Sequence, residues 1–231
     1  MVPVEPPPIL RGRGLTRTYL LGSVEVPALR GVDVDVTRGD FVVLRGPSGS
    51  GKTTLINLLG LLDRPDGGTL LLDGQPVAGM DENALADRRR DRFGFVFQTF
   101  NLVAVLTAAE NVEYPMALRG VSAGARRKRA RDLLAQVGLA GKDDVRPDLL
   151  SGGQRQRVAI ARALANEPEV VLADEPTANL DSKSADEVLD LMQLLHAQRA
   201  TAFVLSTHDP RVVARSRRVV TLHDGRVEPE A

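Results

Sequence analysis

Residues 41–53 read Phe-Val-Val-Leu-Arg-Gly-Pro-Ser-Gly-Ser-Gly-Lys-Thr, and this stretch decides the fold. The apolar run Phe41–Leu44 is short and unbroken, as expected for a strand that is buried on both faces of a parallel sheet. The residues after it fit G-x-x-x-x-G-K-[ST] and lead into a helical pattern, which is the context that this motif requires. The stretch therefore predicts an α/β core that carries a phosphate-binding loop.

The residue types of this loop suit a nucleotide and its metal. Backbone N–H groups can surround phosphate oxygens, and the following helix presents its positive end to them. Lys52 adds a full charge, and Thr53 can ligate Mg²⁺. A glycine-rich turn that merely caps a helix would not explain the Lys-Thr pair. The predicted nucleotide contacts are Gly46, Pro47, Ser48, Gly49, Ser50, Gly51, Lys52, Thr53 and Thr54.

A second apolar run, Val170–Ala173, ends on two carboxylates. Asp174 suits Mg²⁺, through water, and Glu175 suits a general base for the attacking water. Acidic residues that end a strand are often only helix caps or turn formers. In a chain with a phosphate loop, the pair instead predicts the metal and base positions of a nucleotide hydrolase.

The other β patterns divide into two groups. Ala202–Leu205 is a third candidate for a buried parallel strand, whereas Val32, Val34 and Val36 alternate with aspartates as in a half-buried antiparallel strand. Thr69–Leu72 and Val219–Leu222 each precede Asp-Gly, which predicts tight hairpins. We expect both hairpins to be peripheral sheet elements.

Helical patterns are clearest after Thr53, over 122–137, after Ser151 and over 184–196. In the last of these, Ser184 and Glu187 fit a capping box, and the apolar stripe comprises Val188, Leu191, Met192 and Leu195. Residues 99–150 contain no comparable strand pattern and predict a mainly helical insertion. We expect a flexible proline-rich leader over 1–8 and one domain over 9–231.

The overall composition excludes several classes of protein. Thirty Lys and Arg balance thirty Asp and Glu among 231 residues, so no global field favours nucleic acid or anionic lipid. The absence of cysteine excludes disulfides and thiolate metal sites. The beginning of the chain does not resemble a signal peptide, and the longest apolar stretch is too short to span a bilayer.

Residues 150–163 read Leu-Ser-Gly-Gly-Gln-Arg-Gln-Arg-Val-Ala-Ile-Ala-Arg-Ala. Ser151 and Gln154 fit a capping box at the start of a helix, and the paired glycines leave its N-terminus open to an anion. A well-capped amphipathic helix alone would not explain those glycines. This stretch resembles the signature motif of ATP-binding cassette (ABC) proteins, and the resemblance extends from about Leu10 to Val227.

The resemblance implies a P-loop NTPase core with an antiparallel β subdomain and a helical insertion. It also implies a homodimer in which ATP lies between the phosphate loop of one copy and the signature helix of the other. Ser151, Gly152, Gly153 and Gln154 would then bind nucleotide on the second copy.

Four further positions match the family. Gln98 corresponds to the glutamine that senses Mg²⁺ and couples to the membrane partner, and His208 to the switch histidine that contacts the terminal phosphate. Tyr19 is expected to stack on adenine, and Asp181 to touch the opposite copy. Ala178 departs from the usual glycine or serine, and the effect of its extra methyl group is left open.

The resemblance implies an ATPase that powers a separate membrane permease from the cytoplasmic face of the cell membrane. Leu172–Ser182 and Ser206–Pro210 most resemble the macrolide-export and lipoprotein-release branch. Two alternatives remain: a mechanotransmitting ATPase, as in the cell-division member, and a non-transport ATPase that acts on nucleic acid or ribosomes. The second is suggested by Arg126–Arg129 and Arg88–Arg90, although these runs also fit solvated helix faces.

Overall fold

The computed structural model describes residues 7–216 and 218–228, and these residues form two compact units. The first unit comprises the chain up to Ala86 together with the part from Ala202 onward, and the second comprises Asp87–Thr201. Most of the expected leader over 1–8 lies outside the described residues. The expected insertion over 99–150 lies within the second unit, and its limits as a separate domain stay a prediction.

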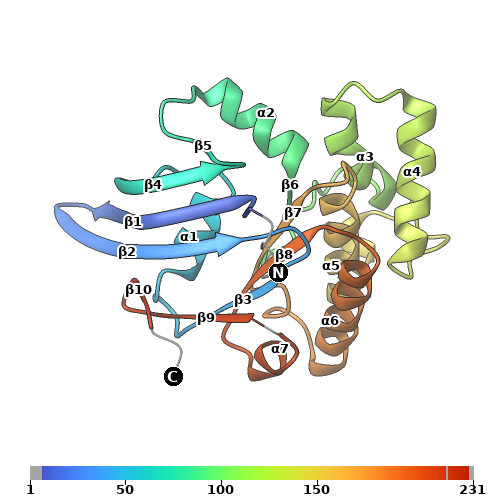
Figure 1. Cartoon of the computed structure of the whole chain (residues 1–231). Coiled ribbons are helices and arrows are strands. Elements are labelled where there is room, and N and C mark those ends of the chain that lie inside the picture. Colours follow the sequence, from blue (N-terminus) through green and yellow to red (C-terminus); the bar gives the residue numbers. More distant parts are fainter. Residues whose placement is uncertain (1–6, 217, 229–231) are drawn as a thin grey trace, which may run out of the picture. The chain divides into compact units, whose positions relative to one another are not determined.

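An antiparallel sheet forms one part of the first unit, where Figure 1 shows its strands side by side. Its order is β2-β1-β4-β5, made of β1 (Leu10–Leu21), β2 (Val24–Val36), β4 (Gly67–Leu72) and β5 (Gln75–Pro76). Val32, Val34 and Val36 are buried, while Asp33 and Asp35 between them are less so. The alternation predicted for this strand is therefore confirmed.

Three parallel strands and the short antiparallel strand β10 (Arg226–Val227) form the rest of the β structure in the first unit. β3 (Phe41–Arg45) pairs in parallel with β8 (Ala202–Thr207) on one side and with β9 (Arg218–His223) on the other. Val42–Leu44 of β3 and Ala202–Leu205 of β8 are completely buried, while Phe41 at the start of β3 is half-buried. The prediction of unbroken apolar strands in an α/β core is confirmed for both.

The two predicted hairpins form as expected, and each lies at the edge of its sheet. Asp73 and Asp224 adopt positive φ angles of 49° and 46°. The glycine that follows each aspartate has a φ angle of 74°. These angles permit the tight turns from β4 to β5 and from β9 to β10 (Arg226–Val227). β5 and β10 are terminal strands of their sheets, while β4 also pairs with β1 and β9 also pairs with β3. Period-two signals in a short strand do not reveal a parallel partner on its other edge.

Two helices complete the first unit, and a third crosses into the second. α1 (Lys52–Leu59) follows the phosphate loop directly, and α7 (Pro210–Ala214) follows β8. α2 (Glu82–Arg92) runs across the division between Ala86 and Asp87.

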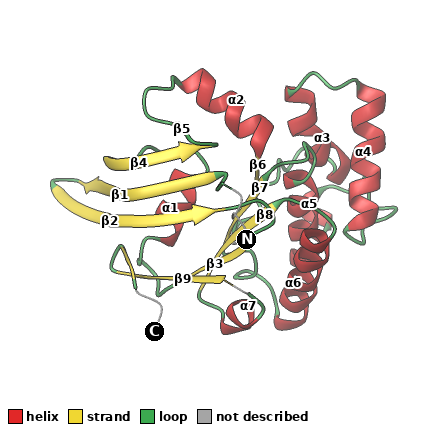
Figure 2. Cartoon of the chain, viewed as in Figure 1, coloured by secondary structure: helices red, strands yellow, loops and turns green. Residues whose placement is uncertain are grey.

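The second unit is mainly helical around two parallel strands (Figure 2). Its elements are β6 (Phe93–Val96), α3 (Ala108–Leu118), α4 (Ala123–Gln136), the short 3₁₀ helix Pro147–Leu149, α5 (Gly152–Ala163), β7 (Val170–Asp174) and α6 (Ser182–Ala197). α5 contacts α3, α4, α6 and β6, which makes it the central helix of this unit. Gly94 permits close packing, because a Cβ there would lie 2.2 Å from the Ala163 carbonyl oxygen.

The predicted start of α6 is wrong. The helix begins one turn earlier, where the Asp181 carboxylate accepts a hydrogen bond from the Ser184 backbone N–H at 3.0 Å. Glu187 pairs with Arg157 at 2.8 Å and takes no part in a capping box. Aspartate and serine are both good N-caps, so N-cap preference alone does not choose between Asp181 and Ser184. The stripe Val188, Leu191, Met192 and Leu195 is buried as expected.

Candidate functional site

The phosphate loop is folded around its own lysine. The Lys52 side chain is buried, and its Nζ donates to the carbonyl oxygens of Gly46 at 2.8 Å and Pro47 at 2.9 Å. Gly49 and Gly51 have φ angles of 80° and 103°, which other residue types rarely adopt. Gly51 is also the N-cap of α1, so the loop ends where the positive end of that helix begins.

The surrounding β structure also determines the shape of this loop. A Cβ at Gly46 would lie 2.2 Å from the Leu222 carbonyl oxygen, and one at Gly51 would lie 2.5 Å from that of Ala28. The Gly225 N–H donates to the Ser50 carbonyl at 3.1 Å. Strand β2 and the β9–β10 turn therefore enclose the loop. The result is a cradle of backbone atoms and one buried cation, which fits a phosphate group.

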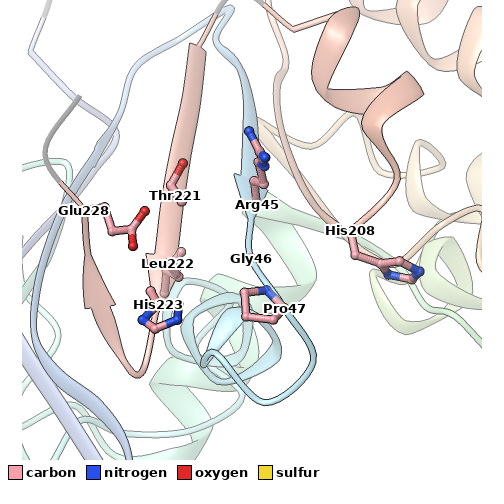
Figure 3. A pocket seen from close by; sticks show the side chains of 8 residues that line it. All are labelled: Arg45, Gly46, Pro47, His208, Thr221, Leu222, His223 and Glu228. Atoms are coloured by element: carbon pink, nitrogen blue, oxygen red, sulfur yellow. The ribbon is translucent and has the colours of Figure 1, made fainter. Parts of the chain in front are cut away.

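The structure brings His208 together with this loop. His208 is exposed just after β8, and it lines a cavity of about 400 Å³ with Gly46 and Pro47 (Figure 3). The other lining residues are Arg45, Thr221, Leu222, His223 and Glu228. The carboxyl ends of β3, β8 and β9 thus supply side chains to one opening, as parallel strands generally do at ligand sites.

In the second unit, the two predicted carboxylates lie at the end of a buried strand. Asp174 is the last residue of β7 and Glu175 follows it, and both side chains are half-buried. Glu175 has a φ angle of 46°, in the left-handed region that is uncommon for glutamate. Strained backbone of this kind is often found at functional positions.

The predicted capping box at the start of α5 is confirmed. The Gln154 N–H donates to Ser151 Oγ at 3.3 Å, and the Ser151 N–H donates to Gln154 Oε1 at 3.0 Å. Gly153 also has a packing role, because a Cβ there would lie 3.1 Å from the Ser184 Cβ in α6. Gly153 therefore permits both an open helix N-terminus and close contact between the two helices.

Side chains from elsewhere in the second unit hold the loop that contains Gln98. Asn179 Nδ2 donates to the Gln98 carbonyl at 3.0 Å. This hydrogen bond joins the Gln98 loop to the segment before Asp181, and the family resemblance gives a functional role to both. Arg162 of α5 donates to the carbonyl oxygens of Phe100, at 2.9 Å, and Asn101. Both of these residues have positive φ angles, of 62° and 48°.

Sequence reasoning missed the arginines and the glutamine that α5 contributes to this region. Burial lowers the pKa of the Arg162 guanidinium, and no described carboxylate pairs with it. The Arg155 guanidinium lies 5.0 Å from the Phe100 ring centre, and Gln156 Nε2 donates to the Pro176 carbonyl at 2.7 Å. The only available signal was polar residues at buried positions of an amphipathic helix. That signal does not show which residues these side chains contact.

The remaining predicted residues have simple surroundings. Ser48, Thr53 and Gln98 are exposed, Thr54 is buried, and Tyr19 is half-buried on β1. A hydrogen bond from Ser184 lowers the pKa of the exposed Asp181 carboxyl. Among the described residues, no three His, Asp or Glu side chains are grouped as a metal site would need. Thr53 and Asp174, which belong to different units, each carry oxygen atoms of the kind that Mg²⁺ prefers, as phosphates do.

The fold and the loop define a P-loop nucleotide-binding protein. The sequence pattern of the ABC transporter family matches residues 29–178. The chain is 51% identical to the macrolide export ATP-binding/permease protein MacB 1/2 of Paracoccus denitrificans, over 95% of this chain and 33% of that protein. It thus spans about a third of such MacB relatives. It is 47% identical to the lipoprotein-releasing system ATP-binding protein LolD 1 of Rhodopseudomonas palustris, over 95% of this chain and 98% of that protein.

A solved structure shows the same fold. It is a dimeric post-hydrolysis state of the ATP-binding cassette MJ0796 bound to ADP and Pi, with a TM-score of 0.89, 42% identity and coverage of 96% of this chain and 97% of that one. The chain belongs to the ABC transporter family. It is an ATP-binding ATPase of the branch that includes MacB and LolD.

Proposed function

We propose that this chain is the motor of a membrane transport complex, which closes as a homodimer around two ATP molecules and couples their hydrolysis to a permease. The observation that carries the proposal is the backbone cradle around buried Lys52 at the start of α1. That cradle suits the triphosphate end of a nucleotide. The likeness to a dimeric cassette bound to ADP and Pi supports the dimer.

The phosphate loop performs the binding step. Lys52 exchanges its carbonyl contacts for phosphate oxygens, while the N–H groups of Gly49–Thr54 and the helix dipole stabilise the negative charge. Thr53, Asp174 and Gln98 hold Mg²⁺, which supplies charge neutralisation to the phosphates when bound. Ser151, Gly152, Gly153 and Gln154 bind the nucleotide held by the second copy, and Asp181 contacts that copy.

Glu175 is the general base in this proposal. It accepts a proton from the attacking water, and His208 contacts the terminal phosphate from the cavity that it shares with Gly46 and Pro47. The left-handed backbone at Glu175 supports this role, because it directs the side chain independently of the regular path of β7. Lys52 and His208 stabilise the charge that spreads over the transferring phosphoryl group.

The partner is a permease on a separate chain, and the complex works at the cytoplasmic face of the cell membrane. Near-complete coverage of the LolD relative, which is named an ATP-binding protein, supports this arrangement. Over residues 7–216 and 218–228, none of the helices has both the length and the apolar character needed to cross a membrane. The names of the relatives favour export or lipoprotein release. Purification of the complex in detergent, with identification of the co-purifying membrane chain, tests this part.

The basic run on α4 does not favour a nucleic-acid partner. Arg126 and Arg127 both pair with Glu113 at 3.1 Å, Arg127 also pairs with Asp144, and Arg129 pairs with Glu167. Arginines that are neutralised in this way release few counterions on binding phosphate backbones. The run therefore stabilises the packing of the second unit.

Substitution of Glu175 tests the proposed mechanism. Glu175→Gln should still bind ATP but lose about 10²- to 10⁴-fold in turnover, because a general base has an effect of that size. The variant should also accumulate as an ATP-bound dimer, seen by size-exclusion chromatography. Glu167→Gln is the control, since Glu167 is exposed and its backbone also lies in the left-handed region, with a φ angle of 53°. Near-normal turnover in Glu175→Gln would contradict the assignment.

A further inference from the structure

Arg17 and Asp63 both contact the Tyr19 side chain. Arg17 Nε donates to Asp63 at 2.9 Å, and its Nη2 also contacts the other oxygen of that carboxylate at 2.9 Å. The Tyr19 hydroxyl donates to the same Asp63 carboxylate at 3.0 Å. The Arg17 guanidinium lies over the Tyr19 ring, 5.0 Å from its centre. One face of the ring is thus covered by a cation, and its far end is held by a carboxylate.

Asp66 joins the same network through Arg17 and Thr18 of β1. It accepts from Arg17 Nη1 at 2.6 Å and from the Thr18 backbone N–H at 2.6 Å. The Asp66 N–H in turn donates to the Thr16 carbonyl at 2.9 Å. The segment 63–66 is therefore attached to β1 by side chains and backbone together. This attachment limits the freedom of the Arg17 guanidinium.

The segment also begins at the end of the phosphate-loop helix. The N–H groups of Leu62 and Asp63 both donate to the Asn57 carbonyl in α1, at 2.8 Å and 3.3 Å. At the other end of α1, Gly51 packs on Ala28 and Leu29 of β2. Leu29 is the register partner of Arg17. Both ends of α1 are thus connected to the part of the sheet that carries Tyr19.

From these contacts we infer that Arg17 and Asp63 are positioning residues for the nucleobase, and that they hold the Tyr19 ring at a set place relative to the phosphate loop. This inference rests on the proposed function and on the role that the family resemblance implies for Tyr19, which is to stack on adenine. ATP is long, so tight binding at both ends requires that the ring and the cradle be correctly spaced. Because the Arg17 guanidinium covers one face of the Tyr19 ring, a base can stack only on the opposite face. A ring held before binding loses less entropy when the base stacks.

Comparison of ATP with tripolyphosphate tests the inference, because tripolyphosphate has the phosphates but no base. The magnesium complexes of both would be titrated against the full chain by calorimetry. Asp63→Asn should weaken ATP binding about three- to tenfold, the usual effect of one hydrogen-bonded contact, and leave tripolyphosphate binding unchanged. Arg17→Gln should act in the same direction. Tyr19→Ala should weaken ATP binding about tenfold or more, since stacking itself is lost.

The matched control is Asp35→Asn. Asp35 pairs with Arg13 at 2.7 Å in the same antiparallel sheet, with no part in the Tyr19 network, and its loss should change neither affinity. An unchanged ratio of ATP to tripolyphosphate affinity in Asp63→Asn, with a lowered ratio in Tyr19→Ala, would overturn the positioning role and leave the base contact intact. An unchanged ratio in Tyr19→Ala would refute the adenine assignment itself. Equal weakening of both ligands in Asp63→Asn would also overturn the inference, because it would indicate damage to the phosphate loop.

Discussion

The phosphate loop and the loop at 98–101 are both irregular and both follow a buried strand, yet they are stabilised in different ways. The first is enclosed by β2 and the β9–β10 turn, and its own residues complete its shape, since Gly49 and Gly51 permit its backbone and Lys52 binds its carbonyls. The second has no glycine, and its left-handed residues Phe100 and Asn101 are held by Arg162 from a helix about sixty positions away.

The two kinds of support give the loops different conformational freedom. A loop of glycines around a lysine presents N–H groups in one arrangement, which suits a ligand that is always the same. A loop that depends on distant side chains responds when those side chains move. The contact from Asn179 to Gln98 connects it to the segment that precedes α6 as well. The comparison suggests a rigid binding element in one unit and a responsive element in the other.

The largest expected effect comes from removing space beneath the phosphate loop. Gly46→Ala should lower ATP affinity at least about tenfold and stability by roughly 3 kcal/mol, because its Cβ would overlap Leu222 and Ser50. Calorimetry and urea unfolding measure the two quantities. Gly124→Ala in α4 is the control, since nothing lies within 4 Å of its Cβ position. Normal ATP binding by Gly46→Ala would show that the phosphate loop is not a rigid binding element.

The next effect should come from Arg162. Arg162→Met removes two hydrogen bonds from a charged donor and should lower the free energy of unfolding by about 2 kcal/mol. Hydrogen exchange in 98–101 should become faster, while exchange in the phosphate loop stays the same. Arg199→Met is the control. Burial also lowers the pKa of Arg199, but its hydrogen-bond partner is Gln136 and not the loop at 98–101. Unchanged exchange in 98–101 would remove the distinction between the loops.

A smaller effect is expected at the start of α5, which carries Arg162. Ser151→Ala should reduce stability by about 1 kcal/mol, because one cap hydrogen bond is lost. Ser122→Ala is the matched control, since Ser122 is the N-cap of α4 but makes no such side-chain bond. Thermal unfolding of both variants measures the difference. Equal losses in the two variants would show that the cap at Ser151 has no special role.

Acid should have the smallest effect, and it should act on the antiparallel sheet. The Thr18 N–H and Arg17 lower the pKa of the Asp66 carboxyl, and Arg13 lowers that of Asp35. These carboxylates stabilise the fold above their unfolded-state pKa of about 4, and the contribution is lost as the pH falls through the lowered values. Urea unfolding between pH 7 and pH 3 should show a loss below about pH 4 that is smaller in Asp35→Asn. An identical loss in both proteins would exclude this carboxylate as a source.

Local patterns predicted much of the fold and of the site. The phosphate loop, the signature helix with its capping box, the buried parallel strands and both Asp-Gly hairpins depend on neighbouring residues, and all of them are found where expected. The true start of α6 and the parallel partner of β9 were not predicted. Asp181 and Ser184 both suit an N-cap, and the pairing of β9 with β3 joins residues far apart in the chain, so the local patterns decided neither feature.

The elements that could be predicted are those governed by backbone chemistry: glycines that permit a cradle, a lysine that fills it, and a serine and glutamine that cap a helix. Only the tertiary structure decided which side chains support those elements. Arg162 is one arginine among many until α5 packs beneath the loop at 98–101, and Asp63 is an ordinary turn residue until β1 brings Tyr19 and Arg17 to it. The reason is physical, since a hydrogen bond between residues far apart in the chain has no local signature.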